Sequence, residues 1–353
     1  MALRDEFPVL EHTAYLNSGT DGPIPRAAAE QARAEIAAEA AEGRLWPHFE
    51  RRHELTDALR AGYARVLGAD TEDVAVTTGT SAGLGYVLAG MDLGPDDEII
   101  TSADEHPGLI GPLIAARQRG VTVRQVPFSQ LAEAVGARTT LVAASHVNWI
   151  TGEIAPVELA DVPVPVILDG AQGAGAIPID VTALNCAAYA AAGQKWLCGA
   201  DGTGMLYLNP EFGARVRTIA PGYGAFEDGS KGLDSILRTN GRRFDGQLSR
   251  ESVAFSLAAL QVLENEGLDA IFDRAADLSD RFAAKLAEAG YTVAPRARTT
   301  LVSFEVEDPE AKREHLLERG VAVRNLPGTP YLRASVGAWN DESDLERLLE
   351  ALR

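Results

Sequence analysis

The chain has 353 residues, too many for one small hydrophobic core, so we expect two domains or one large domain with an appendage. Hydrophobic residues make up 46% and charged residues 24%, which is typical of a soluble globular protein. The net charge of −19 argues against nucleic acid and anionic membranes as partners, because like charges repel. With no apolar run of membrane-spanning length and no secretory signal at the N-terminus, we expect a cytoplasmic location.

The first expected elements are helices. Residues 26–42 are rich in Ala, Glu and Arg at helical spacing, and Pro25 suits a helix start. A second helix is expected at 50–67, ending near Gly68.

From residue 74 onward, short apolar runs alternate with helical stretches. This alternation is typical of an α/β protein with a mainly parallel central sheet flanked by helices, in which ligands bind beyond the carboxyl ends of the strands. The expected strands are 74–78, 98–101, 121–126, 140–144, 164–168 and 187–191.

A smaller α+β domain is expected at the C-terminus. Its predicted elements are helices at 252–266 and 268–289, strands at 301–306 and 321–324, and a terminal helix at 344–353. We therefore predict a large domain over 20–245 and a small domain over 246–353 that also includes residues 1–19. The two cysteines form no disulfide framework, and no Cys/His cluster has metal-ligand spacing, so no metal site is expected.

Two strand-to-helix turns carry candidate ligand-binding residues. Gly79, Thr80 and Ser81 open a helix, where backbone N–H groups and hydroxyls favour a phosphate, although most such turns bind nothing. His106 follows the next strand; a lone histidine is usually structural, but at this position its ring could stack on an aromatic cofactor.

A carboxylate and an amine follow two later strands. Asp169 ends a buried strand, where it either caps the next turn or forms a salt bridge to a pyridinium nitrogen. Lys195 follows an apolar run that would desolvate its ammonium and lower its pKa, as a Schiff-base lysine requires; otherwise it is an ordinary solvated charge.

The order and spacing of these motifs resemble the class V aminotransferase and cysteine desulfurase-like group of fold-type I enzymes, which use pyridoxal 5'-phosphate (PLP). The resemblance extends from Tyr15–Gly19 to Leu332–Ser335, and its most specific motifs are Asp-Gly-Ala-Gln at 169–172 and Gly-Gln-Lys-Trp-x-x-Gly at 193–199. It implies PLP as cofactor, a fold-type I α/β domain and a homodimer.

The resemblance also implies a role for each matching residue. Lys195 is the expected Schiff-base lysine, Asp169 the partner of the pyridine nitrogen and His106 the stacking residue, and these three form the expected catalytic set. The other cofactor contacts implied are Gln172 at the ring hydroxyl, Gln194 beside the lysine, and Gly79, Thr80 and Ser81 around the phosphate.

On the substrate side, Arg333 resembles the arginine that binds the α-carboxylate. Arg324 falls where the family often has a second arginine, although a surface charge is an equal alternative, and Asn17 is expected near the substrate. The chain departs from the family at Ala192, which lacks a usual hydroxyl, and at Ile150, where many members have a polar residue. Gln194 also departs, because many relatives have histidine there.

The resemblance to L-cysteine/cystine C–S lyases favours one reaction within the group. Residues 105–110, a Ser-His-x-x-Trp element and a short loop at 323–333 without cysteine carry it, and the missing cysteine argues against a persulfide-forming desulfurase. The implied reaction is α,β-elimination from cysteine, cystine or a related amino acid, with Lys195 removing the Cα proton, to give pyruvate, ammonia and a sulfur product.

Other functions remain open at this stage. A class V aminotransferase or an isopenicillin N epimerase-like racemase would share every cofactor residue, and a non-catalytic binding protein is a remote alternative. Residues 242–249 resemble the stretch that reaches the neighbouring subunit's phosphate in the homodimer, with Arg243 or Ser249 as the candidate contact. Trp46, His48 and His53 are expected to be packing or dimer contacts.

Overall fold

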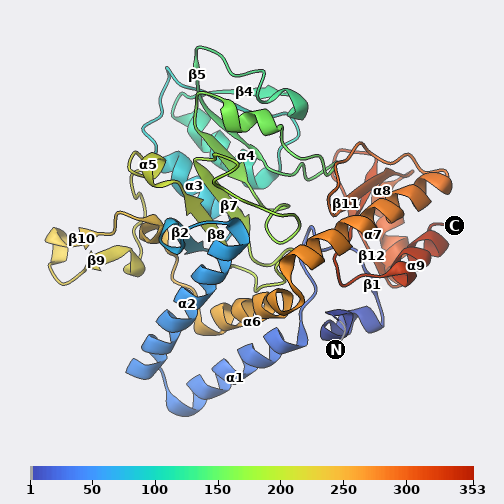
Figure 1. The fold of residues 1–353 in the computed structure, drawn as a ribbon, viewed down its shortest axis with the longest axis horizontal. Helices are drawn as coiled ribbons and strands as arrows, with labels where there is room; N and C mark the ends of the chain where they lie inside the picture. Colours follow the sequence, from blue (N-terminus) through green and yellow to red (C-terminus); the bar gives the residue numbers. More distant parts are fainter. Residues whose placement is uncertain (1–2) are drawn as a thin grey trace.

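A computed structural model describes residues 3–353 of the chain. Its centre is a seven-stranded sheet with strand order β2-β8-β7-β6-β5-β3-β4 (Figure 1). The strands are β2 (Val74–Thr77), β3 (Glu98–Ser102), β4 (Thr122–Val126), β5 (Thr139–Ser145), β6 (Val166–Asp169), β7 (Ala188–Ala192) and β8 (Gly204–Leu208). The neighbouring pairs from β4 to β7 are parallel, whereas β8 is antiparallel to both of its neighbours. The predicted mainly parallel α/β sheet is therefore confirmed.

Strand β8 is absent from the sequence-based expectation. It follows β7 after a connection at 193–203 that contains no crossover helix, so the chain can only return antiparallel beside β7. This connection carries Lys195, which therefore lies in a tight turn at the end of the sheet rather than ahead of a helix.

Helices cover both faces of the sheet because its strands alternate their side chains between two apolar cores. Leu206 and Ile167 point into the core that includes residues of α3 (Thr80–Gly90) and α4 (Pro107–Gln118). Met205 and Leu168 point into the opposite core with α2 (Trp46–Leu67) and α6 (Arg250–Glu266). The long helix α1 (Arg26–Glu42) packs along α6, and α5 (Pro210–Gly213) is a single turn after β8.

The C-terminal part forms a separate layered unit beside the sheet (Figure 1). Its three-stranded antiparallel sheet has the order β11-β14-β13. The elements are β11 (Leu301–Glu305), β13 (Arg324–Asn325), β14 (Tyr331–Ser335), α7 (Leu268–Glu288), α8 (Pro309–Glu318) and α9 (Glu342–Leu352). The N-terminal strand β1 (Ala14–Tyr15) pairs in parallel with β12 (Val321–Ala322), so the start of the chain joins this unit.

The predicted boundary at 245/246 stays a prediction. Helix α6 lies on its C-terminal side, yet packs against α1 and α2 on the other side. Short 3-10 turns link the elements at Leu3–Glu6, Pro8–Glu11, Thr71–Asp73, Phe128–Gln130, Val157–Asp161, Tyr223–Ala225, Gly232–Asp234 and Gly241–Phe244. Within residues 3–353, no helix is both long and apolar enough to cross a membrane.

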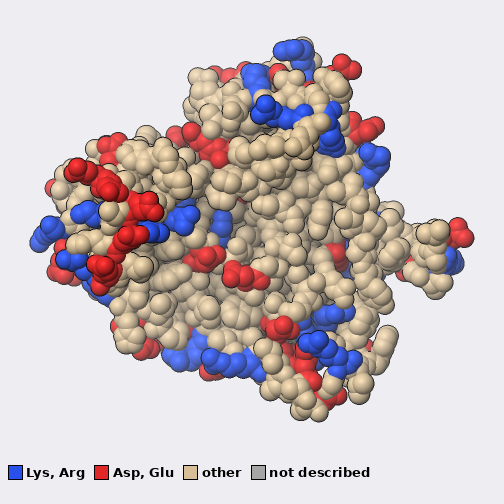
Figure 2. Space-filling model, turned by 180° about the vertical axis from the view of Figure 1, so that it is seen from behind, with Lys and Arg blue, Asp and Glu red and all other residues tan. Residues whose placement is uncertain are grey.

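A two-stranded hairpin of β9 (Phe226–Asp228) and β10 (Ile236–Leu237) projects from the body of the molecule in two opposite views (Figures 1 and 2). Figure 2 also shows that mixed charges crowd the surface of the C-terminal unit, while uncharged side chains cover much of the middle of that face. Because it projects in both views, the hairpin of β9 and β10 is the most isolated part of the fold.

Candidate active site

Polar side chains gather where the parallel strands end. Ser145 and Asp169 are the last residues of β5 and β6 and lie side by side in register, and Lys195 follows β7 by three residues. A cavity of about 350 Å³ opens at this edge, lined by residues 78–82 together with His106, Asp169, Gln194 and Lys195. The structure thus brings together every predicted cofactor residue except Gln172, which does not line this cavity.

Lys195 is held in place by a strap of residues 17–25 from the N-terminal segment. The Gly22 N–H donates to the carbonyl of Gln194 at 2.7 Å, and a Cβ on Gly22 would lie only 2.1 Å from the Lys195 carbonyl oxygen. Burial lowers the pKa of the Lys195 ammonium, and the nearby charge of Asp169 only partly opposes this shift. The predicted desolvation of this lysine is consistent with its surroundings.

Asp169 is a buried carboxylate that has no lysine or arginine within ion-pair distance anywhere in residues 3–353. Only 4% of the residue is exposed, and its Oδ1 accepts a hydrogen bond from the Ala171 N–H at 2.9 Å. Burial raises the pKa of Asp169, and the charge of Lys195 lowers it in part. It therefore caps the following turn and also presents to the cavity a carboxylate that a cation would stabilise.

The turn at Gly79–Ser81 has open space beside it and a polar group without a hydrogen-bond partner. Gly79 has a φ of +144°, which side-chain-bearing residues avoid, and a Cβ there would meet no atom within 4 Å. The Thr80 hydroxyl at the start of α3 is buried without a hydrogen-bond partner in the described chain, and so is Oε1 of Gln194 across the cavity. A helix N-terminus with an orphaned hydroxyl fits a phosphate group.

His106 caps α4, and its ring orientation is constrained from two sides. Its Nδ1 accepts a hydrogen bond from the Gly108 N–H at 3.0 Å, and the Trp149 ring meets it edge to face at 5.0 Å and 84°. Burial lowers the pKa of His106 to about 4, helped by the charges of Lys195 and Arg333, so the ring is neutral at pH 7. A neutral, fixed ring on the cavity wall suits stacking on a flat cofactor.

The Gln172 amide links two segments instead of facing the cavity. Its Nε2 donates to the Gly19 carbonyl at 2.7 Å, and its Oε1 accepts from Nε1 of Trp196 at 3.0 Å. It thereby joins the N-terminal strap to the lysine loop. Its expected contact with a cofactor hydroxyl stays a prediction.

Two arginines face one another at the edge of the C-terminal unit. Arg324 on β13 lies directly opposite Arg333 on β14, and neither forms an ion pair within residues 3–353. Arg333 is 2% exposed; its Nη1 donates to the Trp149 carbonyl at 2.6 Å, and its Nε has no partner among the described residues. Burial lowers its pKa to about 9. An unpaired buried guanidinium of this kind is suited to a carboxylate.

Asn17 lies beside these arginines in the same layer. It forms a parallel bridge with Ser335 at the end of β14, and its Oδ1 accepts from the Thr20 hydroxyl at 2.9 Å. The predicted substrate-side residues therefore lie on neighbouring backbone segments, but none of them lines the cavity that contains Lys195, and their contacts with a substrate stay predictions.

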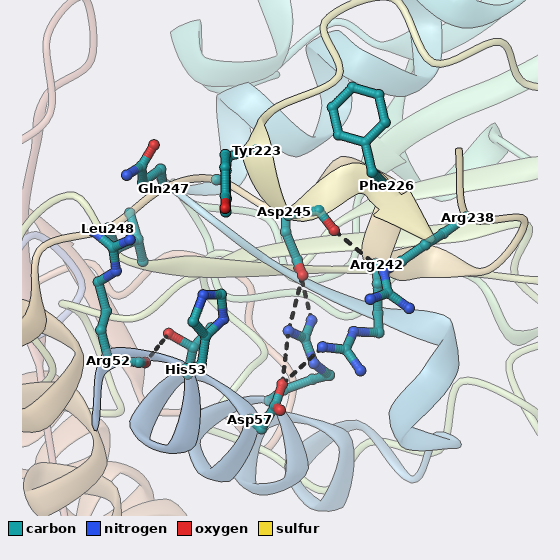
Figure 3. Close-up of a pocket in the computed structure, with 14 residues that line it drawn as sticks. Arg52, His53, Asp57, Tyr223, Phe226, Arg238, Arg242, Asp245, Gln247 and Leu248 are labelled. Carbon is teal, nitrogen blue, oxygen red and sulfur yellow. Dashed lines mark hydrogen bonds and ion pairs between the residues drawn. The ribbon is translucent and has the colours of Figure 1, made fainter. Parts of the chain in front are cut away.

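The segment 242–249 is anchored to β2, the strand that leads into the Gly79–Ser81 turn, because the Gly246 N–H donates to the Val76 carbonyl at 2.8 Å. Asp245 accepts from Arg60 at 2.7 Å and from the Val76 N–H at 3.0 Å, and Figure 3 shows Asp57 and Arg242 converging below it. The candidate dimer contacts have local roles. Arg243 donates to the carbonyls of Gly213, Thr239 and Asn240, and Ser249 caps α6. Their contact with a neighbouring subunit stays a prediction.

Two residues at the site had no assigned role in the sequence analysis. Glu105 is 7% exposed and accepts from the Ser145 N–H at 2.9 Å and from the Ser145 hydroxyl at 2.6 Å. Burial raises its pKa to about 7. Trp149 contacts both His106 and Arg333. For Glu105, the available signal was a carboxylate directly preceding His106 at a strand end; for Trp149, nothing local pointed to either contact.

The two cysteines are buried, and neither lines the cavity. Burial raises the pKa of Cys186 to about 12 and that of Cys198 well above its ordinary value. A thiol that stays protonated and inaccessible is a poor nucleophile.

Comparison with known proteins gives a consistent result. The model of the family described as aminotransferase class-V matches residues 14–348. An isopenicillin N epimerase of Streptomyces clavuligerus is 29% identical, covering 96% of this chain and 93% of that one. A probable cysteine desulfurase of Halalkalibacterium halodurans is 30% identical over 80% of this chain and 78% of its own.

Solved structures are similar over nearly the whole length. The cystine C–S lyase C-DES in complex with its product cysteine persulfide has a TM-score of 0.92 and 29% identity, covering 98% of both chains. A C-DES mutant with glycine covalently linked to its PLP cofactor has a TM-score of 0.93 and 28% identity, covering 99% of this chain and 98% of the other.

Proposed function

This chain belongs to the aminotransferase class-V family, and we propose that it is a PLP-dependent C–S lyase acting on cysteine, cystine or a related sulfur-bearing amino acid. Its fold is that of the fold-type I PLP transferases, and PLP is its cofactor. One observation carries the proposal: Trp149 contacts both His106, which lines the cavity of Lys195 and Asp169, and Arg333, which has no acidic partner within residues 3–353, whereas neither cysteine lines that cavity.

The residues present fit PLP. Bound PLP supplies an electron sink for the bonds at the substrate Cα. The turn at Gly79–Ser81 has one unpartnered hydroxyl, that of Thr80, for the phosphate, and His106 offers a neutral ring for stacking. The Asp169 carboxylate would hold a protonated ring nitrogen, which would also give this buried group the cation it lacks.

The protein's own groups would also orient and deprotonate the substrate. Arg333 would bind the α-carboxylate through its unpaired Nε edge, which fixes the Cα relative to the cavity. Lys195 would take the Cα proton on its ε-amino nitrogen, because burial lowers its pKa and so raises the fraction of free amine. A sulfur leaving group departs as a stabilised anion, so the elimination requires no separate acid.

A persulfide-forming desulfurase is disfavoured by the thiols. That chemistry needs an accessible, ionisable cysteine beside the substrate, whereas Cys186 and Cys198 are buried with raised pKa values. The likeness to the cystine C–S lyase over 98% of the chain supports elimination instead.

An epimerase is the second candidate. The isopenicillin N epimerase from S. clavuligerus covers 96% of this chain, and racemisation at the Cα would use the same base and carboxylate-binding group. The two reactions differ in outcome: elimination releases pyruvate, whereas epimerisation only exchanges the Cα hydrogen with solvent.

The deciding experiment is a visible absorbance scan of the purified protein, followed by a pyruvate assay with cystine. The proposal expects a PLP absorbance band and release of pyruvate, with both the band and the activity lost in Lys195→Ala. An absorbance band with solvent exchange at the Cα but no pyruvate from cystine or cysteine would favour the epimerase. A protein that takes up no PLP would overturn the assignment.

We also propose that the protein is a homodimer. Large apolar side chains are exposed at Leu45, Trp46 and Tyr223. Two more, Leu233 and Ile236, are exposed on the projecting hairpin. Exposed apolar side chains gathered in this way are expected of a protein–protein contact. Light scattering coupled to gel filtration would test this; a monomer at micromolar concentration would contradict it.

A further inference from the structure

We propose that Trp149 is a positioning residue that couples the carboxylate-binding Arg333 to the plane of His106. It lies in the loop that follows β5, in the sheet domain, and contacts both groups through different parts of its structure. The inference rests on the proposed function, in which His106 stacks on PLP and Arg333 binds the substrate carboxylate.

The indole of Trp149 fixes the histidine. Its Nε1 donates to the Asp104 carbonyl at 2.8 Å, and its ring meets the His106 ring edge to face. Asp104 and His106 belong to the same connection between β3 and α4, so one side chain holds both the backbone of that connection and the ring of its last residue. Among the described residues, the capping bond from the Gly108 N–H is the only hydrogen bond that would still orient the His106 ring without the indole.

The backbone of the same residue orients the arginine. The Trp149 carbonyl accepts from Nη1 of Arg333 at 2.6 Å, which fixes one corner of a rigid planar guanidinium. A Cβ at Gly19 would lie 2.8 Å from Nη2, so the absence of a side chain there leaves Nη2 room. The edge formed by Nε and Nη2 thus remains for a carboxylate held by two parallel hydrogen bonds.

The loop is also bonded to the C-terminal unit. The Thr299 hydroxyl donates to the Gly152 carbonyl at 2.8 Å, and the Ser303 hydroxyl donates to the Ile150 carbonyl. Residues 149–152 therefore connect to β11 and β14 on one side and to His106 on the other. A shift of Arg333 on binding a carboxylate would be transmitted through Trp149 to the ring plane of His106.

The competing explanation is that Trp149 only fills space. In that case its loss would reduce thermal stability and leave the cofactor environment unchanged. Trp339 provides a control, because it is a tryptophan of the C-terminal unit, more deeply buried than Trp149, that packs against Phe7 and not against His106. Trp149→Phe keeps an aromatic edge and loses the N–H, and Trp149→Ala loses both.

The test uses the full-length protein loaded with PLP. It measures PLP affinity by absorbance titration, the visible circular dichroism of bound PLP, and the change that added glycine causes in that signal. Glycine has the α-carboxylate but no sulfur to eliminate. We expect Trp149→Ala to weaken PLP binding by roughly three- to tenfold and to abolish most of the glycine-induced change, with Trp149→Phe intermediate. Trp339→Phe should lower the melting temperature and alter neither signal.

Two outcomes would overturn the inference in distinguishable ways. If the wild type binds PLP and responds to glycine, and both Trp149 variants do the same at unchanged affinity, then the coupling is wrong while the proposed function stands. If the wild type binds no PLP, the proposed function fails and the inference fails with it. Trp149→Phe keeps the test decisive if Trp149→Ala does not fold.

Discussion

The middle of the central sheet and its carboxyl end lie only a few residues apart, yet they differ in the kind of side chain that they bury. All of β7 is buried and uncharged, and neighbouring side chains such as Leu206 are fully enclosed. At the carboxyl end of β6 and just beyond β3 and β7, Asp169, Glu105 and Lys195 are ionisable groups whose pKa values burial has shifted. The middle gains stability from burial, whereas the end loses stability by desolvating charge, a cost that proteins tolerate at functional sites.

The largest expected effect is a loss of activity without a loss of stability when Lys195, at the end of the sheet, is replaced. Lys195→Ala should lower pyruvate release by about a thousandfold or more, because both the cofactor link and the proton acceptor are lost. The melting temperature of the PLP-free protein should change little, because removal of the buried ammonium relieves its desolvation while the buried Asp169 loses a charge that partly compensates it. Parallel assays of activity and thermal unfolding check this; a loss of stability comparable to a core truncation would contradict the comparison.

A truncation in the middle of the sheet should act in the opposite way. Leu206→Ala should reduce the free energy of unfolding by about 2–5 kcal/mol, because it leaves a cavity in a fully enclosed position. Activity per folded molecule should stay near wild type. Denaturant titration measures the loss, and Leu317→Ala, at an exposed position on α8, is the control expected to change little. Equal losses in both variants would be evidence against the view that burial in the middle of the sheet stabilises the fold.

Arg333 tests the end of the sheet through substrate binding. Arg333→Met should raise KM by roughly ten- to two-hundredfold, since a charge-assisted hydrogen bond contributes about 1.5–3 kcal/mol. Stability should not fall, because no acidic partner in residues 3–353 is left unpaired. Arg324→Met, which is less buried, should raise KM less. Steady-state kinetics decide the matter, and an unchanged KM in Arg333→Met would remove its proposed role.

The smallest effect concerns pH. The folded pKa of Glu105 is about 7, above its ordinary 4.5, so its neutral form is favoured by folding. The stability linked to this shift is complete below pH 4.5 and is lost as the pH rises through 7. The free energy of unfolding should therefore fall less between pH 5 and 8 in Glu105→Gln than in the wild type, by roughly 1–3 kcal/mol.

Unfolding titrations at several pH values would measure this slope. The exposed Glu318→Gln is the control and should leave the slope as in the wild type. An unchanged slope in Glu105→Gln would mean that this carboxyl is ionised in the folded protein at all of these pH values.

Local patterns were sufficient for the α/β class, the helix positions and the family. The helix predicted at 26–42 has those bounds in the structure, and the positions of Asp169 at the end of a strand and of His106 just before a helix follow from the residues next to them. By contrast, the return of β8 beside β7 was not expected, because an apolar run does not show its direction within a sheet.

The sequence by itself therefore determined the fold class, the family, PLP as cofactor and the groups that gather at the strand ends, because periodicity and turn motifs act over a few residues. Only the tertiary structure decided which distant groups meet. Glu105 and Ser145 are 40 residues apart, and Trp149 and Arg333 are 184 apart. Whether Gln172 bonds Gly19 or whether Glu105 stays protonated depends on packing and desolvation, which arise only when separate segments enclose the same space.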